Sequence, residues 1–387
     1  MNSSLSAVER VASTRLRLFS RRLLSNYVST LFFIGLCYWV VTDVSEFHRS
    51  MLQGEWVLSG PGFNATVTVH AVFVSLIALY AVLLLPYYAA YPWMHANTYT
   101  FLQGLWFAWL RGRRRKAASP SESSGGVTLA SPFSRIGKQA GLALLLKFFF
   151  APLMINWCLL HIANLTSSLL EFVHAMGSGM SGRALFDSSL FWSCFQLILF
   201  VDTLLFTLGY MIEVPALGNR IRSVEPTFFG WFICLACYPP FNDTTQRLFA
   251  WESSDFPFFE SNFVHLTVNV ALLTSLAIFS WASISLGFKA SNLTNRGIVA
   301  RGPYRLVRHP AYAAKNLAWW LGALPTILMF FAAGAWRSLA YALFSLCGWT
   351  AIYALRALTE ERHLLMLRNG YAEYAGKVKW RFVPGLW

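Results

Sequence analysis

A polar segment in the last third of this 387-residue chain combines residue types that suit an anionic or nucleotide-like ligand. Residues 296–316 read Arg-Gly-Ile-Val-Ala-Arg-Gly-Pro-Tyr-Arg-Leu-Val-Arg-His-Pro-Ala-Tyr-Ala-Ala-Lys-Asn, between two apolar runs. Pro310 suits the first turn of a helix, whose free N–H groups favour an anion. Tyr304 and Tyr312 offer flat faces for a cation or an adenine ring. The simpler alternative is that this segment is only the basic flank of a membrane span, followed by a helix that begins at a proline.

An acidic pair, Glu360 and Glu361, follows the next apolar run. Acids near a helix C-terminus oppose the helix dipole, so a partner should offset that cost. Arginines of the 296–308 segment would do so, and so would hydroxyl groups or an amine of a ligand. The alternative is that the two acids lie at a solvent-exposed helix end and need no partner.

The composition predicts an all-α, polytopic integral membrane bundle that positions these residues. The chain is 56% hydrophobic and 12% charged, whereas soluble proteins average about 25% charged residues. Several continuous apolar runs approach or exceed the roughly 20 residues of a membrane-spanning helix, unlike the short alternating segments of a barrel. About eight spans are predicted, at residues 27–43, 66–90, 139–163, 190–212, 228–241, 263–287, 314–333 and 335–355.

The distribution of charge predicts the orientation of the chain. Lys and Arg concentrate before the first run and at 111–138, 213–227, 288–315 and after 355, while acids gather in the loops between. Because basic loops stay in the cytoplasm, both termini are predicted to be cytoplasmic. The net charge of +14 is thus mainly a topology signal. Attraction to anionic membrane lipids is its second meaning, and nucleic-acid binding is not expected because no such motif is present.

Four parts are predicted along the chain. Residues 1–110 contain a basic N-terminal helix and the first transmembrane unit. This helix either lies at the membrane interface or is a plain basic flank of the first span. A basic Ser/Gly/Pro linker at 111–138 follows. The segment 139–262 is a middle transmembrane unit, and 263–387 forms a self-contained unit that carries the polar motifs.

A buried acid also marks the middle unit. Asp202 lies within an apolar run, where an ionisable residue indicates function or a helix–helix pair. Lys147, deep in the third run, is the predicted partner, and a substrate or proton role for Asp202 is the alternative.

Two local patterns carry no site prediction. Cys234 and Cys237 form a C-x-x-C without a second ligand pair, so no metal site is expected. The Gly-x-Gly-x-x-Gly at 177–182 follows no predicted strand and is interpreted as a chance match.

The combined motifs of 263–387 resemble the membrane methyltransferases, which include isoprenylcysteine carboxyl methyltransferases and phospholipid methyltransferases. The pattern is Gly-Pro-Tyr-Arg-x-Val-Arg-His-Pro-x-Tyr, a helical hairpin, Glu-Glu-x-x-Leu, Tyr-x-x-Tyr and a proline near the end. The sequence departs from the family after Tyr312, where Ala-Ala-Lys-Asn replaces an early glycine, so Lys315 and Asn316 are expected to reshape the acceptor side.

The resemblance implies an S-adenosylmethionine-dependent methyltransferase that acts on a lipid, lipid-like or prenylated acceptor at the cytoplasmic membrane face. The cofactor-binding residues that it implies are Tyr304, Arg305, Arg308, His309, Pro310, Tyr312, Glu360 and Glu361. Among these, Arg308, His309 and Glu361 are the catalytic candidates. An NADPH-dependent membrane reductase of the sterol-reductase type and a non-enzymatic membrane binding or transport protein are the alternatives.

Overall fold

The computed structural model describes residues 7–117, 134–367 and 369–386, with side chains from residue 21 onward and not between 114 and 133. Most of the predicted linker at 111–138, and the side chains of the first three N-terminal arginines, therefore lie outside the described residues. The fold is mostly helical, as predicted, and divides into two compact units, residues 1–53 with 70–149 and residues 54–69 with 150–387. The four predicted parts stay a prediction.

The first unit is built from helices whose apolar faces pack around a small polar cluster. Its elements are α1 (Ala7–Trp39), a π-helical turn (Val40–Val44), α2 (Glu46–Leu52), α3 (Val69–Ala90), α4 (Asn97–Ala117) and the start of α5 (Arg135–Gly177). Asn26 on α1 donates to the Met94 carbonyl at 2.9 Å and accepts from the Ala96 amide at 3.1 Å. These bonds fix the chain before α4 against α1.

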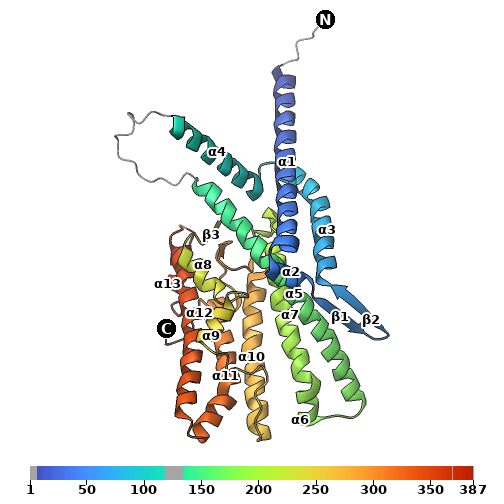
Figure 1. Cartoon of the computed structure of the whole chain (residues 1–387), viewed down its shortest axis with the longest axis vertical. Coiled ribbons are helices and arrows are strands. Elements are labelled where there is room, and N and C mark those ends of the chain that lie inside the picture. Colours follow the sequence, from blue (N-terminus) through green and yellow to red (C-terminus); the bar gives the residue numbers. More distant parts are fainter. Residues whose placement is uncertain (1–6, 118–133, 368, 387) are drawn as a thin grey trace. The chain divides into compact units, whose positions relative to one another are not determined.

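The second unit continues α5 and contains the motif segments (Figure 1). Its strands are β1 (Glu55–Gly60), β2 (Phe63–Thr68), β3 (Ser223–Val224) and β4 (Thr294–Asn295). Both sheets are two-stranded and antiparallel, with β1 on β2 and β3 on β4. Its helices are α6 (Gly182–Leu185), a π-helical turn (Phe186–Leu190), α7 (Phe191–Met211), α8 (Phe228–Leu235), α9 (Asn242–Leu248), α10 (Asn262–Leu286), α11 (Pro310–Ala332), α12 (Trp336–Leu365) and α13 (Tyr371–Lys377), with 3-10 turns at Pro215–Leu217, Gly287–Lys289 and Gly302–Arg305.

Helix α10 is the centre of this unit because it packs against both α7 and α11, and α11 in turn packs against α12. Small residues on α10 allow close approach. Ser275 donates to the Ala314 carbonyl of α11 at 2.7 Å. A core of Phe191, Leu272 and Ala318 joins the three helices α7, α10 and α11. This packing holds the motif segment, which includes the turn at Gly302–Arg305 and the start of α11, against α10.

Among the described residues, six helical segments are long and apolar enough to cross a membrane. They are Arg21–Val44, Val69–Ala90, Arg135–Gly177, Gly182–Met211, Asn262–Lys289 and Trp336–Leu365. The predicted span at 314–333 forms α11, which contains Lys315 and Asn316 and is not one of the six.

The predicted span at 228–241 is not a single helix. Helix α8 has eight residues, about 12 Å at 1.5 Å per residue, which is too short to cross a bilayer core of about 30 Å. The chain turns after Leu235 and resumes as α9, in keeping with the prolines at 239 and 240 that break the run. Residues 228–261 nevertheless run from one end of the unit to the other (Figure 1).

Three basic segments that the sequence assigns to one face meet at one end of this unit. Strand β3 pairs with β4, bringing 213–227 to 288–315. Ser223 lies 3.0 Å from His363 at the end of α12, and the Arg308 amide donates to the Trp380 carbonyl at 2.9 Å. Their shared position is confirmed, whereas the membrane side that they face stays a prediction.

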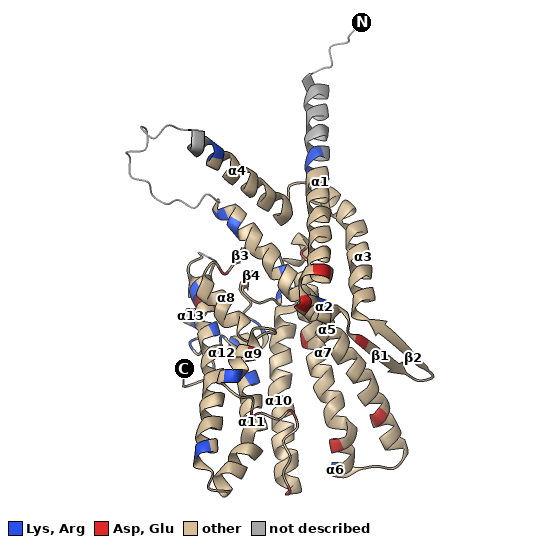
Figure 2. Ribbon diagram, viewed as in Figure 1, with Lys and Arg blue, Asp and Glu red and all other residues tan. Residues whose placement is uncertain are grey.

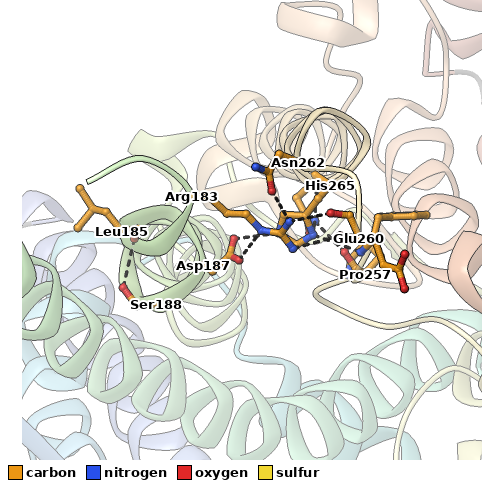
Figure 3. Close-up of polar contacts among 10 residues, drawn as sticks. Arg183, Leu185, Asp187, Ser188, Pro257, Glu260, Asn262 and His265 are labelled. Carbon is orange, nitrogen blue, oxygen red and sulfur yellow. Dashed lines mark hydrogen bonds and ion pairs between the residues drawn. The ribbon is translucent and has the colours of Figure 1, made fainter. Parts of the chain in front are cut away.

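At the opposite end of the unit, a cluster of acidic and basic side chains links two segments of the chain (Figures 2 and 3). Arg183 pairs with Asp187 at 3.1 Å and donates to Asn262 at 2.6 Å. His265, whose side chain is fully buried, lies 2.8 Å from the other Asp187 oxygen. The cluster therefore joins the start of α10 to the turn before α7.

Candidate functional site

The motif segment turns sharply before α11 because Gly302 has a left-handed backbone, with φ of +57°. A Cβ at this position would collide with the Ser285 side chain of α10. Only glycine allows both the left-handed conformation and this close approach. Pro310 is the first residue of α11, as predicted from the sequence, and His309 is its N-cap.

The tail of the chain docks on this segment through backbone and side-chain bonds. The His309 amide donates to the Arg381 carbonyl at 2.9 Å, beside the bond between Arg308 and Trp380. The hydroxyl of Tyr374 on α13 donates to the Tyr304 carbonyl at 2.8 Å. Burial raises the pKa of Tyr374 to about 12 and also raises that of Tyr304, so both phenols stay protonated near neutral pH.

The carboxylate of Glu361, 4% exposed, is the centre of the tail-docking network. It accepts hydrogen bonds from Arg308 at 3.0 Å, His309 at 3.1 Å and Arg381 at 3.1 Å. Glu361 is not one of the residues that line the adjacent cavity. Three donors already hold its oxygens, so Glu361 positions Arg308 and His309 of the motif segment.

Glu360 makes a separate contact on the cavity side of α12. Its carboxylate accepts a hydrogen bond from the Tyr312 hydroxyl. The His309 and Tyr312 rings are stacked, with centroids 5.6 Å apart and an interplanar angle of 8°. The acidic pair was predicted to need partners, and the motif segment supplies them, because Arg308 pairs with Glu361 and Tyr312 bonds Glu360.

A cavity of about 270 Å³ lies beside these contacts, close to the lower limit of small-molecule sites, roughly 300 Å³. Of the cofactor-binding candidates, the following line it: Tyr304, Arg308, His309, Tyr312 and Glu360. Pro310 and Arg305 do not line it. Pro310 is buried at the start of α11, while the side chain of Arg305 is exposed.

Arg356 is a cavity residue that the sequence reasoning missed. Its side chain is 3% exposed and makes no ion pair within the described part of the chain. One guanidinium nitrogen donates to Asn292 at 3.1 Å, and Nε has no partner. The guanidinium also faces the rings of Tyr238, Tyr312 and Tyr353, 5.0 to 5.7 Å from their centroids. Its position one turn before Glu360, directly after the predicted span at 335–355, was the available signal.

A buried cation with an unmade hydrogen bond indicates an anionic ligand, because leaving such a donor unpaired costs about 1–3 kcal/mol or more. Arg296 reinforces the charge of the cavity. It is 2% exposed, donates to the Asn219 carbonyl at 2.7 Å, and its Nη2 has no partner. The cavity can thus hold a carboxylate or another anion against guanidinium groups.

Asp202 on α7 also lines the cavity and accepts a hydrogen bond from Ser283 on α10. Lys315 of α11 lines the same cavity. The predicted partner Lys147 belongs to the other compact unit, and their pairing stays a prediction.

No group of three or more His, Cys, Asp or Glu side chains that could hold a metal ion occurs among the residues with a described placement. Comparison with protein-family models and with curated proteins found no match to this chain. The resemblance to membrane methyltransferases therefore rests on the motif residues themselves.

Proposed function

We propose that this protein is an integral membrane methyltransferase that uses S-adenosylmethionine and acts on a lipid or lipid-modified acceptor. The observation that carries the proposal is the joining of two distant motifs at one cavity, through the contact between Tyr312 and Glu360. The acceptor would enter from the bilayer, in a chain of about eight membrane crossings with α11 and the broken 228–261 segment as two of them.

The residues around the cavity fit the chemical groups of this cofactor. Arg356, with its unpaired Nε, suits the carboxylate. Glu360 has a second oxygen that can accept from ribose hydroxyls. The aromatic rings of His309 and Tyr312 suit the adenine or the sulfonium. The bound cofactor would supply an electrophilic methyl group.

The chain's own residues would orient and enclose the reactants. Methyl transfer is a displacement that depends on alignment and on exclusion of water. The docked tail covers the motif segment, and Glu361 of α12 fixes Arg308 and His309. His309 Nδ1 also lies 3.9 Å from the Glu360 carboxylate, close enough for an ion pair but not for a hydrogen bond.

The test is calorimetric titration of the purified, detergent-solubilised protein with S-adenosylmethionine. Glu360→Gln keeps the side-chain size and removes the charge, and we expect it to weaken binding by about 10- to 100-fold, the value of one or two charge-assisted hydrogen bonds. Glu373→Gln, at an exposed acid on α13, is the matched control and should bind normally. Glu361 is left intact because its replacement would disturb the tail.

Absence of binding to the folded protein would refute the proposal. Binding of NADPH instead would favour the reductase alternative, and binding of neither would favour a non-enzymatic role. Where the cofactor binds, transfer of a labelled methyl group into lipid extracts completes the assignment.

A further inference from the structure

The cavity contains a second polar site, formed by one anion and one cation from different helices. Asp202 of α7 and Lys315 of α11 both line it. They make no ion pair, so their charged atoms are more than 4.0 Å apart. Ser283 donates the hydrogen bond that Asp202 receives. Both charges are therefore available to a ligand group in the cavity.

Lys315 is held by aromatic rings. Its ammonium lies 5.5 Å from the centroid of Phe279, 5.6 Å from that of Trp319 and 6.0 Å from that of Tyr353. Across the described chain it has no hydrogen-bond acceptor, although an ammonium has three donors. Lys315 is half-buried and lines the cavity, so an oxygen of a ligand there can accept from its ammonium.

These rings form the kind of cage that proteins use to bind ammonium head groups. Here the protein's own lysine fills the cage, and the Arg356 guanidinium faces one of the same rings, that of Tyr353. An amine acceptor would therefore meet two cations. A carboxylate acceptor would be attracted by Lys315 but opposed by the Asp202 carboxylate, and the proposed function assigns the Arg356 guanidinium to the carboxylate of the cofactor. A hydroxyl group avoids both conflicts, since it can donate to Asp202 while accepting from Lys315.

We propose that Asp202 and Lys315 form the acceptor subsite, which selects an amphiphile with an uncharged hydroxyl head over one with an amine or carboxylate head. This inference rests on the proposed methyltransferase function. Apolar cavity residues, among them Met154, Phe206 and Phe279, would contact the hydrocarbon part. During transfer the methyl C–S bond breaks, a C–O bond forms, and the hydroxyl proton passes to Asp202.

The experiment uses three photoactivatable probes with the same twelve-carbon chain and a hydroxyl, ammonium or carboxylate head. Each probe is crosslinked to the purified full-length protein, and labelling of the peptides of α7 and α11 is quantified by mass spectrometry. This readout needs no methyl donor. We expect the alcohol to label these peptides about tenfold more than the other two probes.

Variants then test the assignment of each charge. Lys315→Met removes the positive charge from the cage and should raise labelling by the amine about tenfold while lowering that by the alcohol. Asp202→Asn should raise labelling by the carboxylate. Lys315→Arg keeps the charge and should keep the preference for the alcohol. Lys377→Met, at an exposed lysine, is the control for the methionine substitution.

Equal labelling by the three probes, or an unchanged preference in Lys315→Met, would overturn the inference. A parallel titration with S-adenosylmethionine separates this failure from failure of the proposed function. If the cofactor binds and no head-group preference exists, only the acceptor subsite is wrong. If the preference exists and the cofactor does not bind, the binding subsite stands and the methyltransferase proposal fails.

Discussion

Removing the charge of Glu361 should release the C-terminal tail from the motif segment. The substitution Glu361→Gln keeps the shape of the side chain but replaces a carboxylate that accepts from Arg308, His309 and Arg381. Breaking a fully buried ion pair costs about 3–5 kcal/mol. The side chains of Arg308 and Arg381 are 12% and 27% exposed, so water can partly replace the lost charge. We therefore expect tail docking to lose about 2–3 kcal/mol.

This loss corresponds to about a 30- to 150-fold larger population of the undocked tail, at 1.4 kcal/mol per factor of ten. Limited trypsin digestion measures that population when opening is fast relative to cleavage. Lys377, Lys379 and Arg381 supply cleavage sites in the tail. The rate at which intact protein loses the tail should rise by the same factor, while cleavage elsewhere stays constant.

Glu373→Gln is the control for this experiment because it changes an acid of the same tail without touching the network. Its partner Lys377 lies 2.7 Å away at the surface, where such pairs add little. We expect an unchanged cleavage rate for this variant. A rise of less than threefold in Glu361→Gln would refute the conclusion that the carboxylate holds the tail.

Two further substitutions test the packing that positions the site. Gly209→Ala places a Cβ against the Ala290 backbone carbonyl. We expect the folded protein to lose about 1–3 kcal/mol of stability and to aggregate at a lower temperature in detergent. An unchanged midpoint of thermal aggregation would contradict this close contact. Asp187→Asn weakens the bonds to Arg183 and His265 at the far end of the unit. We expect faster amide hydrogen exchange at the start of α10, with cofactor affinity retained. Unchanged exchange would show that the cluster does not stabilise the start of this helix.

The sequence predicted the helical, apolar character of the chain and the start of α11 at Pro310. Both depend on local information, namely composition and the missing N–H of proline. It also predicted that the acidic pair would need partners, because adjacent acids at a helix end are unfavourable. It did not predict that the 228–241 run forms a short helix, since average hydropathy does not reveal where a helix breaks.

Only the tertiary structure decided what each charged residue contacts. Glu360 and Glu361 are neighbours in sequence, yet one faces the cavity and the other holds the tail, because successive residues point to different sides of a helix. Arg356 looked like a membrane flank and instead carries an unpaired donor into the cavity. Lys315 looked like a departure from a motif and is enclosed by three aromatic rings. Composition and spacing determine which segments become helices, whereas the faces that meet depend on packing between segments distant in the chain.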